Sequence, residues 1–354
     1  MSAYGMTKSI AYTLAGFAGV PRLLQRIFVR DGISILMYHS VTKEPLSVPD
    51  WCFVQERSFQ EQMVYLKNHC RVIPLKDVPS LTRENNGRPK VAITFDDGYR
   101  DNFLCAFPVL KAFDLPATIF LATGYLDSCE LPWYDQISWA FKLTTQPRLS
   151  LGHLGGPEAY LGGRSERLQA MSKTLAWLRV IKQDDRLRHI PQVLDALHVP
   201  AHLSVPNPML SWEEVRQMYK QNICFGAHTV SHPVLAKIQG DKLEEEITGS
   251  KNKIEEKLQR PVQHFAYPFG QTSDVSAEAK QTVQRAGFST AVTTVWRLNR
   301  PGDDLFELKR FSPRFNPWDF HLGRFAMMLD WYRLAGVQRG EEPRTWAWDS
   351  KERQ

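Results

Sequence analysis

Residues 91–98 constrain this chain most, because an apolar run there ends in two adjacent carboxylates, Asp96 and Asp97, and a glycine. The run 91–95 is short and rich in β-branched residues, which predicts a buried strand. In α/β proteins, ligands and chemistry lie at the carboxyl ends of parallel strands. Two neighbouring carboxylates repel each other, so we expect one to bind a metal ion and the other to act as a base. Taken alone, the stretch is also what a strand followed by a polar Asp-Gly turn would contain.

A second candidate site follows the apolar run 223–227, where His228 and His232 are four residues apart. Histidines at this spacing can lie on one face of a helical turn, with Cβ atoms about 5–6 Å apart. That arrangement suits one divalent metal bound through imidazole nitrogens, and Asp97 would complete a two-histidine, one-carboxylate set with open positions. A surface turn would explain the histidine pair by itself, but the presence of both motifs at strand ends favours a metal site.

The order of these motifs resembles that of the polysaccharide deacetylases, the NodB-homology group (carbohydrate esterase family 4). Thr-Phe-Asp-Asp-Gly at 94–98 precedes His-Thr-x-x-His at 228–232, and the segment 265–270 is similar to the family's loop of proline, aromatic residue and glycine. The resemblance covers roughly residues 33–315. It implies an irregular (β/α)7-type barrel, and strands that alternate with helices from residue 33 to 311 independently indicate an α/β architecture.

The resemblance also implies roles for individual residues. Asp97, His228 and His232 would hold one divalent ion; zinc is the default from the affinity order of first-row metals, with Co²⁺, Mn²⁺ or Ni²⁺ as alternatives. Asp96 would be the catalytic base. The loop that contains Tyr267, Pro268 and Phe269 would contact the substrate, and the backbone N–H of Phe269 would stabilise the oxyanion.

Two positions depart from the family pattern. Many members have a general-acid histidine near the C-terminal end of the homology region, and no such pattern follows residue 300 here. Tyr38-His39, at the end of the apolar run 33–39, resembles the N-terminal motif of permuted relatives that act on exopolysaccharides, so His39 is the predicted general acid. The alternative is a strand-end histidine satisfied by backbone groups. Tyr267 stands where many members have an arginine that helps to position the base, and Arg310 or Arg314 could replace it.

Trp133 and Asp135 are further candidates, because in related enzymes aromatic and acidic groups of this kind line the sugar site and orient the catalytic histidine. A half-buried aromatic helix is an equally good interpretation of the same residues.

The domain organisation follows from composition along the chain. We expect an amphipathic N-terminal segment over residues 1–30, a deacetylase-like barrel over 31–335 and a polar tail over 336–354. Residues 146–207 interrupt the alternation of strands and helices and predict a mainly helical insertion that covers the barrel or shapes substrate choice. Within the first segment, residues 8–30 carry apolar and arginine faces that suit either a membrane surface or packing on the body of the protein. A secretory signal is a less favoured alternative.

Composition bounds the partners and the compartment. The net charge of +6 is modest for 354 residues, and no compact Lys/Arg cluster or known nucleic-acid motif occurs, so no nucleic-acid partner is expected. The five cysteines are odd in number and lack CxxC spacing, which favours a reducing compartment. We therefore expect a cytoplasmic protein, with peripheral membrane contact through residues 8–30 as an option.

The predicted function is removal of N-acetyl groups from the amino sugars of a poly- or oligosaccharide, in exopolysaccharide or cell-surface glycan biosynthesis. One alternative keeps the fold but acts on another substrate, as an amidase of cyclic amides or a deformylase. The other is a carbohydrate-binding protein without turnover. The presence of Asp96 beside Asp97 disfavours that second alternative, because binding does not need a base.

Overall fold

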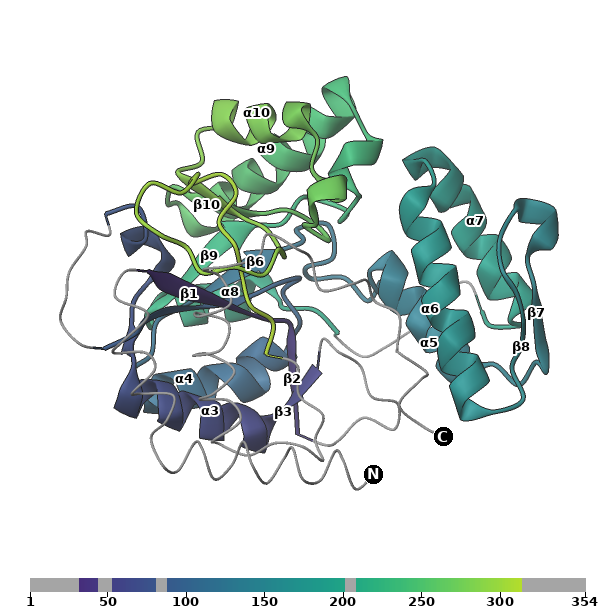
Figure 1. Ribbon diagram of the computed structural model, residues 1–354, viewed down its shortest axis with the longest axis horizontal. Coiled ribbons are helices and arrows are strands. Elements are labelled where there is room, and N and C mark those ends of the chain that lie inside the picture. Colours follow the sequence, from purple (N-terminus) through teal and green to yellow (C-terminus); the bar gives the residue numbers. More distant parts are fainter. Residues whose placement is uncertain (1–31, 44–52, 81–87, 201–207, 314–354) are drawn as a thin grey trace.

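A curled parallel sheet forms the centre of the protein, as Figure 1 shows. The computed structural model describes residues 32–43, 53–80, 88–200 and 208–313. The sheet order is β1 (Ile33–Tyr38), β5 (Lys90–Phe95), β6 (Ala117–Leu121), β9 (Ile223–Ala227), β10 (His264–Ala266) and β11 (Thr290–Val292), and β4 (Arg71–Val72) pairs with β5. All of these pairings are parallel. The predicted strand over 91–95 is therefore confirmed as β5.

Residues 308–311 link the first and last strands of this order. Leu308 forms a parallel bridge with Val292 of β11, and Phe311 forms one with Leu36 of β1. The expected α/β architecture is confirmed as a curled parallel half-barrel with helices, whereas the (β/α)7 repeat remains a prediction.

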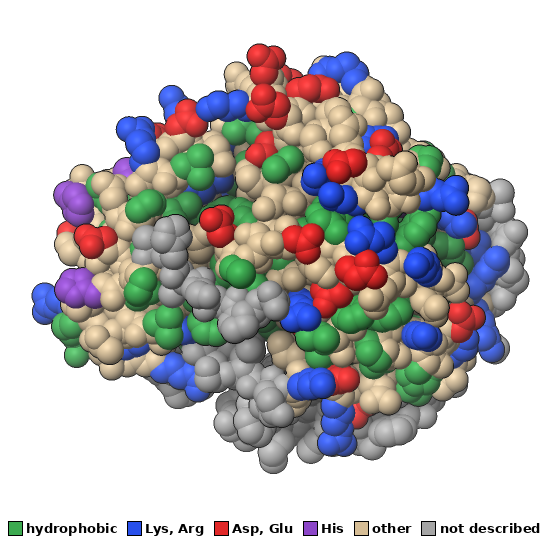
Figure 2. Space-filling view, turned by 180° about the vertical axis from the view of Figure 1, so that it is seen from behind, with side chains coloured by type: hydrophobic (Ala, Val, Ile, Leu, Met, Phe, Trp, Pro, Cys, Tyr) green, Lys and Arg blue, Asp and Glu red, His purple; other side chains and the backbone are tan. Residues whose placement is uncertain are grey.

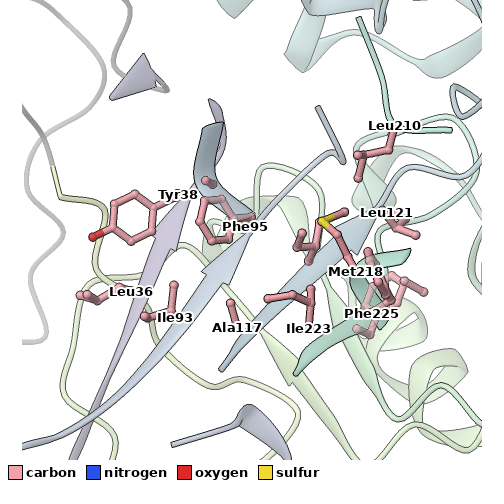
Figure 3. Close-up of a cluster of buried hydrophobic side chains, with 14 of the residues drawn as sticks. Leu36, Tyr38, Ile93, Phe95, Ala117, Leu121, Leu210, Met218, Ile223 and Phe225 are labelled. Carbon is pink, nitrogen blue, oxygen red and sulfur yellow. The ribbon is translucent and has the colours of Figure 1, made fainter. Parts of the chain in front are cut away.

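Amphipathic helices pack against the sheet because their apolar residues recur at helical spacing. The helices of the main body are α3 (Glu56–His69), α4 (Phe107–Ala112), α8 (Trp212–Tyr219), α9 (Gly240–Leu258) and α10 (Ala277–Arg285). In Figure 1, α3 and α4 lie on one side of the sheet, and α9 and α10 on the other. Figure 3 shows how Phe95 and Leu121 of the sheet lie in one apolar layer with Met218 of α8.

The shorter elements of the main body complete its description. Strands β2 (Ser40–Thr42) and β3 (Phe53–Gln55) form a separate pair. A π-helical turn, η2 (Asn102–Ala106), precedes α4, and the 3₁₀ turns are η1 (Leu75–Asp77), η4 (Leu235–Lys237) and η5 (Thr272–Asp274).

The insertion forms a second body with its own core, at the right of Figure 1. It consists of β7 (Arg148–Ser150), the 3₁₀ turn η3 (Gly152–Leu154), β8 (Glu158–Tyr160), α6 (Arg164–Val180) and α7 (Gln183–Ala196), which follow α5 (Trp133–Leu143). Its longest elements are the helices α6 and α7. The described part of the insertion ends at residue 200, and the domain boundaries remain predictions.

Several sequence predictions lie outside the described residues: the amphipathic segment 1–30 with its membrane contact, Arg314, and the tail 336–354. Within the four described ranges, no helix combines the length and apolarity that crossing a membrane requires. The cysteines within the described ranges form no disulfide with one another, namely Cys70, Cys105, Cys129 and Cys224. On the face shown in Figure 2, basic and acidic side chains are interspersed.

Candidate active site

Asp97, His228 and His232 lie together beyond the carboxyl ends of β5 and β9, and all three are buried. Asp97 Oδ1 is 3.5 Å from His228 Nε2 and 3.4 Å from His232 Nε2. The two Nε2 atoms are 3.1 Å apart. The structure thus brings together the three residues that were expected to bind a metal, although Asp97 precedes His228 by 131 positions in the chain.

These three atoms have the spacing that a metal ion requires. In tetrahedral zinc sites, metal–ligand distances of 2.0–2.1 Å place ligand atoms about 3.3 Å apart. Asp97 Oδ1 is buried and accepts no hydrogen bond, which is unfavourable for a carboxylate oxygen unless a cation compensates it. His228 Nδ1 lies 2.7 Å from the carbonyl oxygen of Ala266, so that nitrogen carries the proton and Nε2 keeps its lone pair. The residues present therefore fit a divalent cation.

The protonation state of His232 favours the same conclusion. Burial, together with the neighbouring His228, lowers the pKa of His232 to about 3, so its ring is neutral, as a metal ligand must be. Burial by itself would raise the pKa of Asp97. The adjacent imidazoles of His228 and His232 outweigh that effect, and the pKa of Asp97 is lowered.

The loop that carries the histidines is not the helical turn that their spacing suggested. Thr229 and His232 have φ angles of 66° and 55°, which breaks helical geometry. Glu246 of α9 stabilises the loop by accepting hydrogen bonds of 2.8 Å from the N–H groups of Val230 and Ser231. The two imidazoles converge because the loop turns back on itself, and their ring centroids are 4.7 Å apart.

Asp96 is not a member of this cluster and pairs with Arg310. The guanidinium donates to both carboxylate oxygens, at 2.6 and 2.7 Å, and its Nε donates to the carbonyl oxygen of Thr293 at 2.9 Å. Both side chains are almost completely buried, at 0% and 2% exposure. Burial raises the pKa of Asp96, but the charge of Arg310 outweighs it and the pKa is lowered. Asp96 is therefore ionised at neutral pH.

His39 follows β1, and its Nε2 lies 4.0 Å from Asp96 Oδ2. The backbone in this region is held by side chains of η2 and the residue before it. Asn102 Nδ2 donates to the carbonyl oxygen of His39 at 2.7 Å, and the Ser40 hydroxyl hydrogen-bonds Asp101. The predicted general acid is thus next to the predicted base.

Phe269 and Pro268 form a loop beside His232. The ring of Phe269 is 4.9 Å from that of His232, centroid to centroid, and Phe269 has a φ of 60°. Thr294 Oγ1 donates to the Phe269 carbonyl oxygen at 2.5 Å. Among the described residues, none accepts a hydrogen bond from the Phe269 N–H. This donor remains available for a substrate oxygen.

Tyr267 does not join this group, although it belongs to the same motif. Its side chain is completely buried in the main core, and its hydroxyl donates to the carbonyl oxygen of Phe306 at 3.0 Å. It follows β10 directly and points into the protein interior, so the expectation that it contacts substrate through its side chain is not supported by its position.

Of the aromatic and acidic candidates on α5, Trp133 lies beside His232. Its Nε1 lies 3.4 Å from the carbonyl oxygen of His232, and the side chain is buried. Asp135 accepts a hydrogen bond of 2.8 Å from the hydroxyl of Tyr99. Sequence reasoning did not assign Tyr134, whose ring centroid is 4.8 Å from that of His232. Its place between Trp133 and Asp135 was the available signal.

Comparisons with known proteins identify the family. The family model for polysaccharide deacetylase matches residues 83–291. Residues of this chain are 38% identical over 93 positions to YxkH of Bacillus subtilis, a protein named as a polysaccharide deacetylase; the match covers 25% of this chain and 31% of that protein. The chain belongs to the polysaccharide deacetylase family. The predicted enzyme class, hydrolysis of the C–N bond of N-acetyl groups, is the class of this family.

Solved structures share the fold. The deacetylase PplD of Streptococcus pyogenes, determined in complex with acetate, has a TM-score of 0.54 at 19% identity, over 81% of this chain and 96% of that one. A de-N-acetylase from Aggregatibacter actinomycetemcomitans has a TM-score of 0.51 at 16% identity, over 79% and 94% of the two chains.

We predict that the protein binds one zinc ion per chain and that Asp97→Ala abolishes this binding, because the change removes one of three ligands. Metal content after dialysis against zinc, measured by mass spectrometry, tests the prediction. The matched control is the adjacent Asp96→Asn, which alters a carboxylate outside the ligand triangle and should retain one ion. Retention of zinc with unchanged affinity in Asp97→Ala would contradict the assignment.

Proposed function

We propose that this protein is a metal-dependent hydrolase that removes N-acetyl groups from amino sugars of a poly- or oligosaccharide, in the synthesis of an exopolysaccharide or cell-surface glycan. The observation that carries the proposal is the state of Asp96. It is a buried, ionised carboxylate, paired with Arg310 and adjacent to the ligand set, and His39 lies 4.0 Å away. A binding protein would not need an ionised base in this position.

The residue types match the requirements of amide hydrolysis. A divalent ion on Asp97, His228 and His232 would polarise the acetyl oxygen and lower the pKa of water, to about 7 if it is zinc. Asp96 takes a proton from the attacking water, and Arg310 keeps the carboxylate oriented. The new C–O bond turns the carbonyl oxygen into an oxyanion, to which the Phe269 N–H donates a hydrogen bond.

His39 completes the reaction as the general acid. The C–N bond breaks, the proton from His39 goes to the leaving amine, and acetate and the free amino sugar are released. Support for an N-acetyl substrate comes from the two fold relatives, one named as a de-N-acetylase and the other determined with acetate. A cytoplasmic location, with residues 8–30 at a membrane surface, is part of the same proposal.

The expected outcome is release of acetate from N-acetylated hexosamine oligomers by the zinc-loaded protein, measured over a panel of substrates with defined metals. Asp96→Asn should remove this activity while the metal remains bound. The panel includes a cyclic amide and an N-formyl amine, so turnover of only these two would favour the amidase or deformylase alternative. Saturable sugar binding without turnover of any substrate would favour the carbohydrate-binding alternative.

His39→Ala should lower turnover of the sugar amide on the order of 10²–10⁴-fold, the usual contribution of positioned acid–base catalysis. The aryloxide of an aryl acetate leaves without protonation, so His39→Ala should lose little of the steady-state rate on this ester. Zinc content should not change, because His39 is outside the ligand triangle. Unchanged turnover of the amide by His39→Ala would show that another residue is the acid.

Arg310→Met should move the acid limb of the kcat/KM pH profile to higher pH. In the native protein the charge and hydrogen bonds of Arg310 keep the pKa of Asp96 below its usual value. Without them the largest remaining effect is burial, which raises the pKa, while His228 and His39 still lower it. The base is then protonated, and activity lost, at a higher pH than before. Arg310→Lys keeps a charge and should shift the limb less.

The control for this experiment is Arg297→Met, because Arg297 pairs with Asp303 near the surface at 2.8 Å and its side chain is 40% exposed. Its acid limb should coincide with that of the native protein. If the acid limb of the Arg310→Met profile coincides with that of the native protein, Asp96 is not the base.

A further inference from the structure

The core of the insertion extends to the wall of the candidate active site. Trp133 is one of its buried members, and Phe269 packs against it as a partly buried residue. Phe269 comes from the loop after β10, more than 70 positions beyond the end of the insertion helix α7 (269 − 196). The loop that offers the oxyanion donor is therefore in contact with the insertion as well as with the half-barrel.

Arg179, in the last turn of α6, makes a direct connection to this loop. Its Nη2 donates to Asp274 Oδ2 at 2.5 Å and its Nε donates to Oδ1 at 3.2 Å. The same guanidinium lies 5.2 Å from the ring centroid of Phe269, within the range of a cation–π contact. The side chains of Arg179 and Asp274 are only 20% and 5% exposed, so solvent screens the pair weakly.

Arg186 of α7 fixes the end of α6 from which Arg179 projects. Its Nε donates to the Leu178 carbonyl oxygen at 2.7 Å, and Nη2 lies 3.5 Å from the Arg179 carbonyl oxygen. The guanidinium is buried and lies 5.0 Å from the ring centroid of Trp133. Burial lowers the pKa of Arg186 to about 10, so it stays charged at neutral pH.

The Phe269 backbone requires such support. A φ of 60° is unfavourable for a residue with a side chain, and such conformations persist only where the surroundings impose them. Thr294 holds the loop from the half-barrel side through the Phe269 carbonyl oxygen. Arg179 holds it from the insertion side, through the Phe269 ring and through Asp274, which also accepts a hydrogen bond of 2.9 Å from the Gln271 N–H.

We propose that Arg179 is a positioning residue for the reaction: through Asp274 and the ring of Phe269, it orients the Phe269 N–H toward the oxyanion. The insertion is then part of the catalytic apparatus and does more than cover the site. The inference rests on the proposed function, because it concerns the same transition state. Displacement of an oxyanion donor by about 1 Å is enough to slow an enzyme 10–100-fold.

The test compares Arg179→Met, Arg179→Lys and Arg188→Met in the full, zinc-loaded chain. Arg179→Met should lower kcat for the sugar amide roughly 10–100-fold, with KM and zinc affinity within about two-fold of the native values. The lysine keeps the charge but not the planar fork, so we expect an intermediate kcat. Arg188 is the matched control: it is on α7, pairs with the neighbouring Asp185 and is 73% exposed, so kcat should not change.

Two further readouts separate positioning from other roles. An aryl acetate should not rescue Arg179→Met, because the ester also passes through an oxyanion, whereas it should rescue His39→Ala. Hydrogen–deuterium exchange of residues 267–274, measured without substrate, should be faster in Arg179→Met than in Arg188→Met. If Arg179→Met is too unstable to purify, the same two measurements on Arg179→Lys decide the question.

The inference would be overturned by native kcat in Arg179→Met, by a change confined to KM, or by equal loss of kcat, zinc and thermal stability. The last two outcomes would indicate a substrate contact and a purely structural role, respectively. A native protein that releases no acetate from any substrate would instead overturn the proposed function. In that case faster exchange of residues 267–274 would still show whether Arg179 orders the loop.

Discussion

The structure depends on how two adjacent carboxylates at the end of β5 are neutralised. An uncompensated buried charge costs several kcal/mol, and Asp96 and Asp97 are both buried. Asp96 is compensated by Arg310, which lies in the segment that links β11 to β1. Asp97 faces two histidine nitrogens with the geometry of a metal site. The same segment that curls the sheet thus supplies the cation that keeps the candidate base ionised, so architecture and site are coupled.

Several residues of this site have unfavourable backbone conformations. Asp97, Thr229, His232 and Phe269 all have positive φ values between 55° and 71°. The loops that carry the last three are held by contacts from other elements: Glu246 of α9 binds the histidine loop, and Thr294 and Arg179 hold the loop of Phe269. Such strain is common where side chains or N–H groups must point at a ligand. The helices and the insertion therefore keep the site preorganised, which is the condition for electrostatic stabilisation of a transition state.

The parts of the site that follow from sequence are those encoded by local pattern. An apolar run with two aspartates predicted both the strand and its functional end, and β5 confirms the strand. Local pattern misled where tertiary contacts override it. The spacing of His228 and His232 suggested a helical turn, but Glu246 stabilises a loop in its place. Motif membership suggested that Tyr267 contacts the substrate, but its ring is buried in the main core and its hydroxyl donates a hydrogen bond to the carbonyl oxygen of Phe306.

From sequence alone, one can name the atoms that are able to bind a metal, the carboxylate left over as a base, and the absence of the usual C-terminal histidine pattern. The sequence did not determine which arginine pairs with Asp96. Arg310 and Arg314 are equally plausible by composition, and 214 positions separate Arg310 from Asp96. The link from Arg179 to Asp274, across 95 positions, was equally hidden. Both pairings arise from how strands and helices pack in space, and side-chain chemistry along the chain carries no record of that packing.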